Sequence, residues 1–400
     1  MQKVKNFFKN LLVTVVVLAL LLLLPIDRGF AFVAAASHGY KTSSITNDVN
    51  RYYYQNLTKT EQEAYRYICT QITDFPERIY IPKLSKDELN EVFEAVLYDN
   101  PEFWFLENYC NYESRSASFL TVCASFIPVY RCDSATYQEK QSQVEAAAEE
   151  ILAAAPEDSD YEKELYIHDK LIELCDYGDP DEGSDISTLT IYGALVEHAP
   201  VCEGYAKAAQ YLLTKMGIPC YVVIGEAVDS STGTAESHMW NVVTIGGQKY
   251  CLDLTWDDHT SLGSQGDPTT PSHIYFNVTV EELSETHTAK DSTDVAGCTH
   301  TEANYFVKEG LLFDSFGSTE QTAACQALTE ALNQGQGSLE LRFSSKAAMR
   351  SAEQALVQNR GIFRIISAAN ESLGAAKRAS TSSVRYTEND SLFVLAFHFS

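Results

Sequence analysis

A cysteine, a histidine and an aspartate each stand in a sequence context that suits nucleophilic catalysis. Cys202 begins a helical pattern in Pro200-Val-Cys-Glu-Gly-Tyr-Ala206, whereas His238 and Asp253 lie in two successive strand patterns. A thiol, an imidazole and a carboxylate can supply an attacking sulfur, a general base and a group that orients the base. The sequence therefore predicts Cys202 as nucleophile, His238 as base and then acid, and Asp253 as the group that orients His238.

The connection between the two strands bears on whether His238 and Asp253 can meet. It is Gly246-Gly247, the composition of a two-residue hairpin turn. If Ile245 faces Gln248, Asp253 becomes the diagonal neighbour of His238 on the same face of the sheet. A three-residue loop would instead place the two side chains on opposite faces.

The position of Cys202 at a helix start favours its ionised form. Unpaired backbone amides and the helix dipole stabilise an anion there, so a thiolate is expected. The backbone N–H of Cys202 is an expected oxyanion donor, and the sequence does not identify a second one. The alternative for Cys202 is a buried core cysteine, and for Asp253 an ion pair with a basic side chain.

Four motifs together resemble those of the transglutaminase-like superfamily, including its secreted bacterial members. They are Pro200–Ala206, Met216-Gly-Ile-Pro219, His238-Met-Trp-Asn241 and Asp253-Leu-Thr-Trp256, within a resemblance that spans about residues 145–258. The resemblance implies a papain-like core, in which an antiparallel sheet carrying the His and the Asp packs on the nucleophile helix. It also implies cysteine acyl chemistry on an amide-like bond. Nothing resembles the calcium loops of animal transglutaminases, so we expect no cofactor and no metal.

Four residues beside the predicted triad are candidates for a substrate groove: Glu203, Tyr205, Trp240 and Trp256. The alternative for the two tryptophans is packing in the core. For Glu203, the alternative is a favourable charge at the helix N-terminus.

The remaining histidines and the acidic segment give no metal signature. Five histidines lack metal-ligand spacing to one another, and Asp179–Asp185 reads as a solvated loop. These histidines are His168, His198, His259, His273 and His287.

Changes in sequence pattern divide the chain into four segments. We expect a signal peptide or N-terminal anchor in 1–36, an α/β domain in 42–135, the transglutaminase-like catalytic domain in 136–297 and an α/β module in 298–400. The predicted fold class is therefore α+β, with a papain-like core between two flanking α/β regions.

Strands of the catalytic domain are expected at 220–228, 238–245 and 248–256. In the C-terminal module we expect strands at 305–313, 338–343, 362–366, 384–386 and 392–399, and helices at 320–332 and 347–357.

The N-terminus has the features of an export signal. Three lysines precede an apolar run from Leu11 to Leu24, and Ala34-Ala35-Ala36 follows. We expect cleavage after Ala36 because the run is short for a membrane span; an uncleaved anchor is the alternative. The protein is then secreted or at the cell surface, and membrane-bound only if the segment is retained.

The composition of the chain limits the classes of binding partner that we expect. The formal net charge of −26 argues against nucleic acid, and a hydrophobic fraction of 45% excludes a disordered chain. Export would permit disulfides, but the ten cysteines do not fix a connectivity, and Cys220 and Cys251 are expected to be buried. The expected partner is a peptide or protein substrate, with cell-wall peptide as one class.

Three functions follow from these features. The favoured one is hydrolysis of a peptide or isopeptide amide through a thioester, because water needs no dedicated amine site. Transfer of the acyl group to a lysine amine, as in crosslinking, is the second. The third is a non-catalytic cell-surface binding module that retains the triad as scaffold.

Overall fold

The structure is a computed structural model, and it describes residues 14–15, 26–37, 51–117, 120–178, 186–228, 233–258 and 270–399. Most of the apolar run at 11–24, the acidic segment 179–185 and His259 lie outside these residues. The described chain forms two compact units, Met1–Glu139 and Lys140–Ser400. No helix among the described residues is long and apolar enough to cross a membrane.

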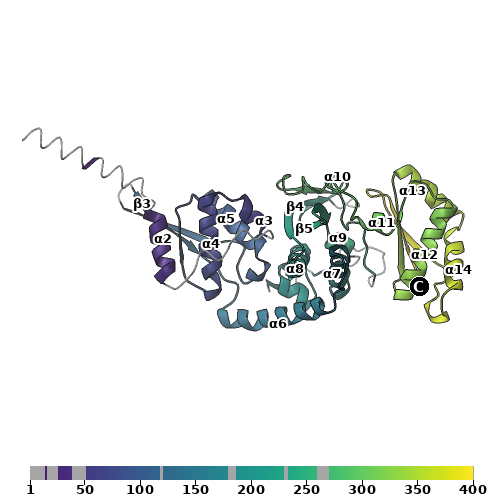
Figure 1. Cartoon of the computed structure of the whole chain (residues 1–400), viewed down its shortest axis with the longest axis horizontal. Helices are drawn as coiled ribbons and strands as arrows, with labels where there is room; N and C mark the ends of the chain where they lie inside the picture. Colours follow the sequence, from purple (N-terminus) through teal and green to yellow (C-terminus); the bar gives the residue numbers. More distant parts are fainter. Residues whose placement is uncertain are drawn as a thin grey trace, which may run out of the picture. The chain divides into compact units, whose positions relative to one another are not determined.

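Among its described residues, the first unit contains a three-stranded antiparallel sheet in the order β1-β3-β2 and four helices that lie wholly within it. The four helices are labelled in Figure 1. Thr58 and Ser85 each close a capping box, which fixes the starts of the two longest helices that lie wholly within this unit. The strands are β1 (Ile79–Ile81), β2 (Asn111–Ala117) and β3 (Leu120–Ile127), and the helices are α2 (Ile26–Ser37), α3 (Tyr52–Asn56), α4 (Lys59–Gln71) and α5 (Lys86–Asp99).

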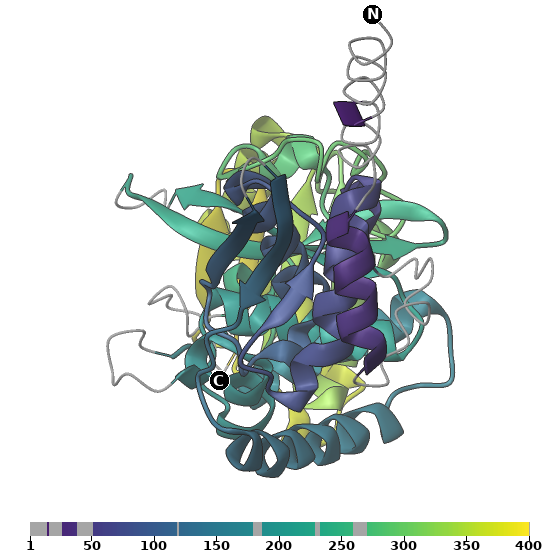
Figure 2. The same cartoon turned by 90° about the vertical axis from the view of Figure 1, so that its left-hand side faces the viewer.

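Helix α2 packs against β1 and β3, as Figure 2 shows. The ring of Phe30 lies edge-on to Tyr80 at 5.0 Å, and Arg28 pairs with Glu63 at 3.3 Å. The segment predicted to end in a cleavage site thus contributes part of this unit's packing. Its cleavage or retention stays a prediction.

The second unit begins within α6 (Ser134–Ala153), which crosses the boundary between the units. Its first sheet has the order β6-β5-β4-β7 and is antiparallel throughout. The strands are β4 (Cys220–Val228), β5 (Ala235–Ile245), β6 (Gln248–Leu252) and β7 (His287–Ala289). Helices α7 (Asp160–Leu174) and α8 (Cys202–Lys215) pack on each other, and α8 lies on β4 and β5.

The predicted hairpin register is confirmed. Ile245 pairs with Gln248, and Gly246 and Gly247 have φ of 58° and 82°, as a type I′ turn requires. The predicted strand to Trp256 was wrong, however, because β6 ends at Leu252 and α9 (Leu254–Asp257) follows. The chain turns there because the Asp253 side chain caps the first amides of α9.

The second sheet of this unit has the order β10-β11-β9-β8, antiparallel except for β8 beside β9. It comprises β8 (Leu312–Phe313), β9 (Ser338–Phe343), β10 (Arg385–Asn389) and β11 (Val394–His398), with α12 (Ser318–Gln334), α13 (Lys346–Glu353) and α14 (Ile362–Glu371).

Two predicted strands in this region are helical. Most of the expected strand 305–313 is α11 (Tyr305–Lys308), and 362–366 is the first part of α14. In α14 the buried residues Ile362, Ile365, Ile366 and Ala369 follow helical spacing, which a five-residue window does not reveal.

The remaining short elements complete the chain. They are α10 (Val280–Leu283), 3-10 turns at Ile72–Asp74, Pro101–Phe103, Ile186–Leu189 and Ala375–Lys377, and π-helical turns at Gly193–Glu197 and Gln354–Gln358.

Candidate active site

Cys202 is the first residue of α8 and is half-buried. The preceding residue, Val201, makes no side-chain cap, so no side chain at that position occupies the amides of the first turn. The turn at 186–190 lies under this helix start, where Val201 N–H donates to Thr188 at 2.8 Å. Gly204 permits this approach, because a Cβ there would lie 2.5 Å from the Thr188 carbonyl oxygen.

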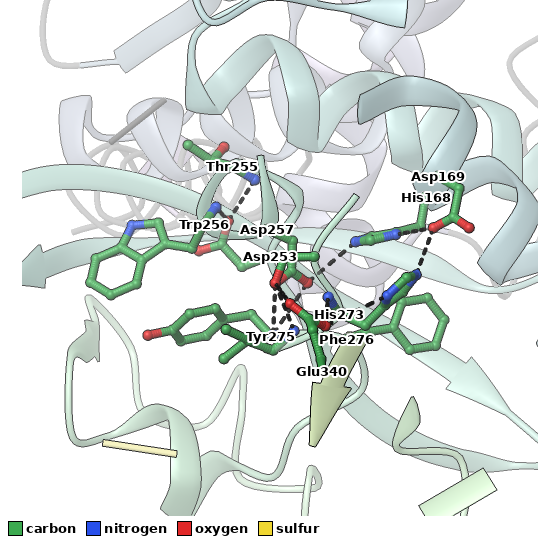
Figure 3. Close-up of polar contacts among 12 residues, drawn as sticks. His168, Asp169, Asp253, Thr255, Trp256, Asp257, His273, Tyr275, Phe276 and Glu340 are labelled. Carbon is green, nitrogen blue, oxygen red and sulfur yellow. Dashed lines mark hydrogen bonds and ion pairs between the residues drawn. The ribbon is translucent and has the colours of Figure 1, made fainter. Parts of the chain in front are cut away.

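His238 on β5 and Asp253 at the end of β6 are brought into contact, as the register predicts. His238 Nε2 lies 2.7 Å from Asp253 Oδ2, and both side chains are buried. Asp253 Oδ1 accepts the backbone N–H groups of Thr255 and Trp256 at 3.0 and 3.2 Å (Figure 3). One carboxylate oxygen therefore fixes the helix start while the other orients the imidazole.

A second histidine completes this group. His287 Nε2 lies 2.9 Å from the same Asp253 Oδ2, and His287 Nδ1 lies 2.8 Å from the Thr286 hydroxyl. No sequence pattern signals this contact, because β7 reaches the site only by pairing with β4, where His287 pairs with Ala227. His287 is a positioning residue that contacts the same carboxylate oxygen as His238.

The electrostatics favour an imidazolium at His238. Burial lowers the pKa of His238, but the charge of Asp253 and hydrogen bonds to Asp253 and Cys202 outweigh it and raise the pKa to about 10. Burial alone would raise the pKa of Asp253, whereas the two histidines hold it well below its ordinary value. Burial lowers the pKa of His287, which therefore acts as a neutral donor.

Because Nε2 of His238 is engaged by Asp253, Nδ1 is the ring nitrogen left for the Cys202 thiol. A buried carboxylate, an imidazole beside it and a sulfur at a helix N-terminus form the arrangement of a cysteine nucleophile with its base and orienting group. The three predicted residues are thus brought together by three different elements.

Tyr177 adds a polar group next to the nucleophile. Its segment runs beside 198–200, with Asp176 N–H donating to His198 and Gly178 N–H to Pro200, each at 2.9 Å. Burial raises the pKa of Tyr177 to about 12, while a hydrogen bond from the backbone N–H of Cys202 opposes the rise. The phenol oxygen therefore lies at the amide that was expected to bind an oxyanion.

The four groove candidates fall into two pairs. Tyr205 and Trp240 are 0% and 2% exposed, so they pack in the core. The prediction that these two residues line a substrate groove was therefore wrong. Tyr205 donates to Asp258 at 2.6 Å. Trp256 and Glu203 are half-buried, and Glu203 pairs with Lys207 at 2.7 Å, so these two stay candidates.

Among the described residues, two groups could hold a metal ion: His238–Asp253–His287 and His168–Asp169–His273. In the first group, Asp253 already accepts two imidazole and two backbone donors, which leaves its oxygens occupied. The geometry of the His238–Asp253–His287 group therefore suits proton transfer.

The comparisons with known proteins agree with this description. Residues 145–253 match the family model of the transglutaminase-like superfamily, so the chain contains a transglutaminase-like domain within a mixed helix and sheet fold. The family match and the Cys–His–Asp arrangement together support a cysteine enzyme. No curated protein matches the chain.

Solved structures similar to this chain include a TGase, at 13% identity and a TM-score of 0.26, over 44% of this chain and 50% of that one. A candidate cysteine protease from Cytophaga hutchinsonii is similar at 13% identity and a TM-score of 0.23, over 36% and 62%. A candidate protease from Parabacteroides distasonis has 12% identity and a TM-score of 0.22, over 38% and 37%. The chain spans about half the length of the first of these structures.

Proposed function

We propose that this protein is an exported cysteine hydrolase that cleaves a peptide or isopeptide amide through a Cys202 thioester. The observation that carries the proposal is the buried His238–Asp253 pair, 2.7 Å apart, behind a half-buried cysteine at a helix start. Burying a charged pair costs desolvation free energy that the attraction within the pair often does not repay. The pair is therefore poor evidence for a stabilising scaffold, and a scaffold role for these residues is disfavoured.

The reaction follows from the positions of the groups. The Cys202 thiolate attacks the amide carbon. The Cys202 N–H, which donates to the Tyr177 oxygen in the free protein, and the Tyr177 hydroxyl would both donate to the oxyanion once the substrate oxygen displaces that contact. His238 gives its proton to the leaving amine, so the C–N bond breaks and a thioester remains. Water then loses a proton to His238 and attacks the thioester, which releases the acid and restores the Cys202 thiolate beside the protonated His238.

Alkylation of the native protein tests the activated nucleophile. Iodoacetamide at pH 6 is expected to modify Cys202 far faster than the half-buried Cys110, whose pKa burial raises to about 11. His238→Ala should slow the labelling of Cys202 alone. Labelling of Cys202 no faster than in denatured protein would refute the proposal.

Acceptor choice is tested with a protein substrate such as casein and a fluorescent primary amine. Hydrolysis predicts new peptide termini without incorporated amine, and Cys202→Ala should abolish them. Cys202-dependent incorporation of the amine would instead establish the second candidate, transamidation.

A further inference from the structure

A second buried cluster of titratable groups lies outside the proposed reaction. It consists of His168 and Asp169 on α7, Asp257 on α9, His273, and Glu340 on β9, and we call it the His168–His273 cluster (Figure 3). All five side chains belong to the second compact unit.

Two imidazole nitrogens in this cluster converge on one carboxylate oxygen. Asp169 Oδ1 lies 2.9 Å from His168 Nδ1 and 2.9 Å from His273 Nε2. A tetrahedral zinc ion with bonds of about 2.0–2.1 Å needs donors about 3.3 Å apart. The two oxygen–nitrogen distances therefore need to lengthen by only a few tenths of an ångström, and the three donor atoms all lie within 4.8 Å of one another.

The far nitrogen of each histidine is directed at a further carboxylate. His168 Nε2 lies 3.3 Å from Asp257 Oδ2, and His273 Nδ1 lies 3.8 Å from Glu340 Oε2. A carboxylate behind each ligating imidazole is the usual outer shell of a histidine metal site.

These outer carboxylates are themselves held in place. Asp257 accepts the backbone N–H of Tyr275 at 2.9 Å, and Glu340 accepts from the Ser272 hydroxyl at 2.7 Å and from the His273 backbone at 2.9 Å. The ring of Tyr305 stacks on His273 at a centroid distance of 3.9 Å, which fixes the plane of the imidazole.

The cluster differs from the catalytic group in its charge. Two histidines share Asp253 there, and their other nitrogens are directed at a thiol and at the Thr286 hydroxyl. Here two histidines face three carboxylates. With neutral imidazoles the cluster carries an excess of three negative charges, which either two protons or one divalent cation reduces to one.

An acidic cavity of about 340 Å³ gives access to the cluster. Asp169, His273 and Glu340 line it together with Glu309 and Glu330, and its described lining contains no lysine or arginine. Such a cavity attracts cations, provides an entry path and leaves room for a further ligand on the metal.

We propose that the His168–His273 cluster binds one divalent transition-metal ion through His168 Nδ1, Asp169 Oδ1 and His273 Nε2, with Asp257 and Glu340 as outer-shell acceptors. The ion takes the place of protons on the two imidazoles, so binding releases protons to the solvent. It joins α7 to β9 and stabilises the second unit. This site is independent of the chemistry at Cys202.

Calorimetric titration of the chelator-treated full chain with Zn²⁺ tests the proposal. We expect one ion per chain, release of protons and a raised melting temperature. His273→Ala should weaken binding by about 100-fold or more, and Asp257→Asn by about 10- to 100-fold. His300→Ala is the matched control, because His300 is a half-buried histidine of the same unit outside the cluster. The His300→Ala protein should bind zinc as the wild type does.

X-ray absorption of the wild-type zinc form provides a readout that does not depend on the variants folding. Two imidazole ligands and oxygen ligands are expected, and Co²⁺ should give the visible bands of a four- or five-coordinate ion. Absence of stoichiometric binding, affinity unchanged in His273→Ala, or a spectrum without imidazole ligands would overturn the proposal.

Discussion

His287 Nε2 lies 2.9 Å from Asp253 Oδ2, although the two residues are 34 positions apart in the sequence. The oxygen that His287 contacts is also the one that orients His238. The charge of Asp253 is thus shared by two imidazoles, of which one is cationic and the other a neutral donor.

Replacing His287 should weaken the site through Asp253. His287→Leu is expected to leave one donor fewer on a buried carboxylate, which costs about 1–3 kcal/mol of unfolding free energy. The rate of Cys202 alkylation at pH 6 should fall as well, because His238 is held less firmly. His287→Gln should restore part of the unfolding free energy and part of the alkylation rate, because the glutamine amide can donate a hydrogen bond to Asp253. Urea unfolding and labelling kinetics measure the two effects; an unchanged His287→Leu protein would contradict the assigned role.

The stability of the fold should depend on pH through His238. Its pKa of about 10 in the folded state exceeds the ordinary value of 6.5. The folded chain then binds the proton more tightly, so this contribution is complete below about pH 6.5 and is lost as the pH rises to about 10. The difference in unfolding free energy between wild type and His238→Gln should shrink across that interval in urea titrations. A difference that grows with pH would exclude the ion pair.

Tyr177→Phe separates oxyanion stabilisation from activation of the thiol. The burst of acylation from an activated ester should slow by about 100-fold, the usual effect of losing one oxyanion donor. Alkylation of Cys202 forms no oxyanion and should keep its rate. Tyr166→Phe is the matched control, because its hydroxyl donates to Ile151 O. Equal loss of both reactions in Tyr177→Phe would indicate a structural role instead.

Glu164 on α7 should destabilise the second unit at alkaline pH. Burial raises its pKa to about 8, and Asn277 donates to Oε2 at 2.8 Å while Oε1 has no partner. A raised carboxylate pKa means that stability is lost as pH rises from about 4.3 to 8. Glu164→Gln should therefore raise the unfolding free energy at pH 8.5 and change it little at pH 5. Replacing the exposed Glu149 by Gln serves as the control. A lower unfolding free energy of the Glu164→Gln protein than of the wild type at pH 8.5 would contradict this account.

Local patterns predicted the parts of the site that local rules determine. The Gly-Gly turn was sufficient to predict that His238 lies beside Asp253, because the length of a turn determines which residues face each other. The helix pattern was sufficient to predict that Cys202 begins a helix. The capping role of Asp253 escaped prediction, since the same residues also read as a continuing strand.

Contacts made by distant segments were not predictable. His287 reaches Asp253 by pairing of β7 with β4, and His168 meets His273 by packing of a loop on α7. Their sequence spacing carries no sign of either meeting. In the C-terminal region, the apolar run 362–366 fits a strand or a helix equally, and only packing decides between them.

The contacts of Glu340 bear on when this protein can fold during synthesis. Ser272 and the His273 backbone need a carboxylate that lies about 70 residues later in the chain. A nascent chain that extends past His273 but ends before β9 contains these donors and lacks the Glu340 carboxylate, so the donors stay without this acceptor. We therefore expect the segment around His273 to reach its final structure only after β9 has been synthesised.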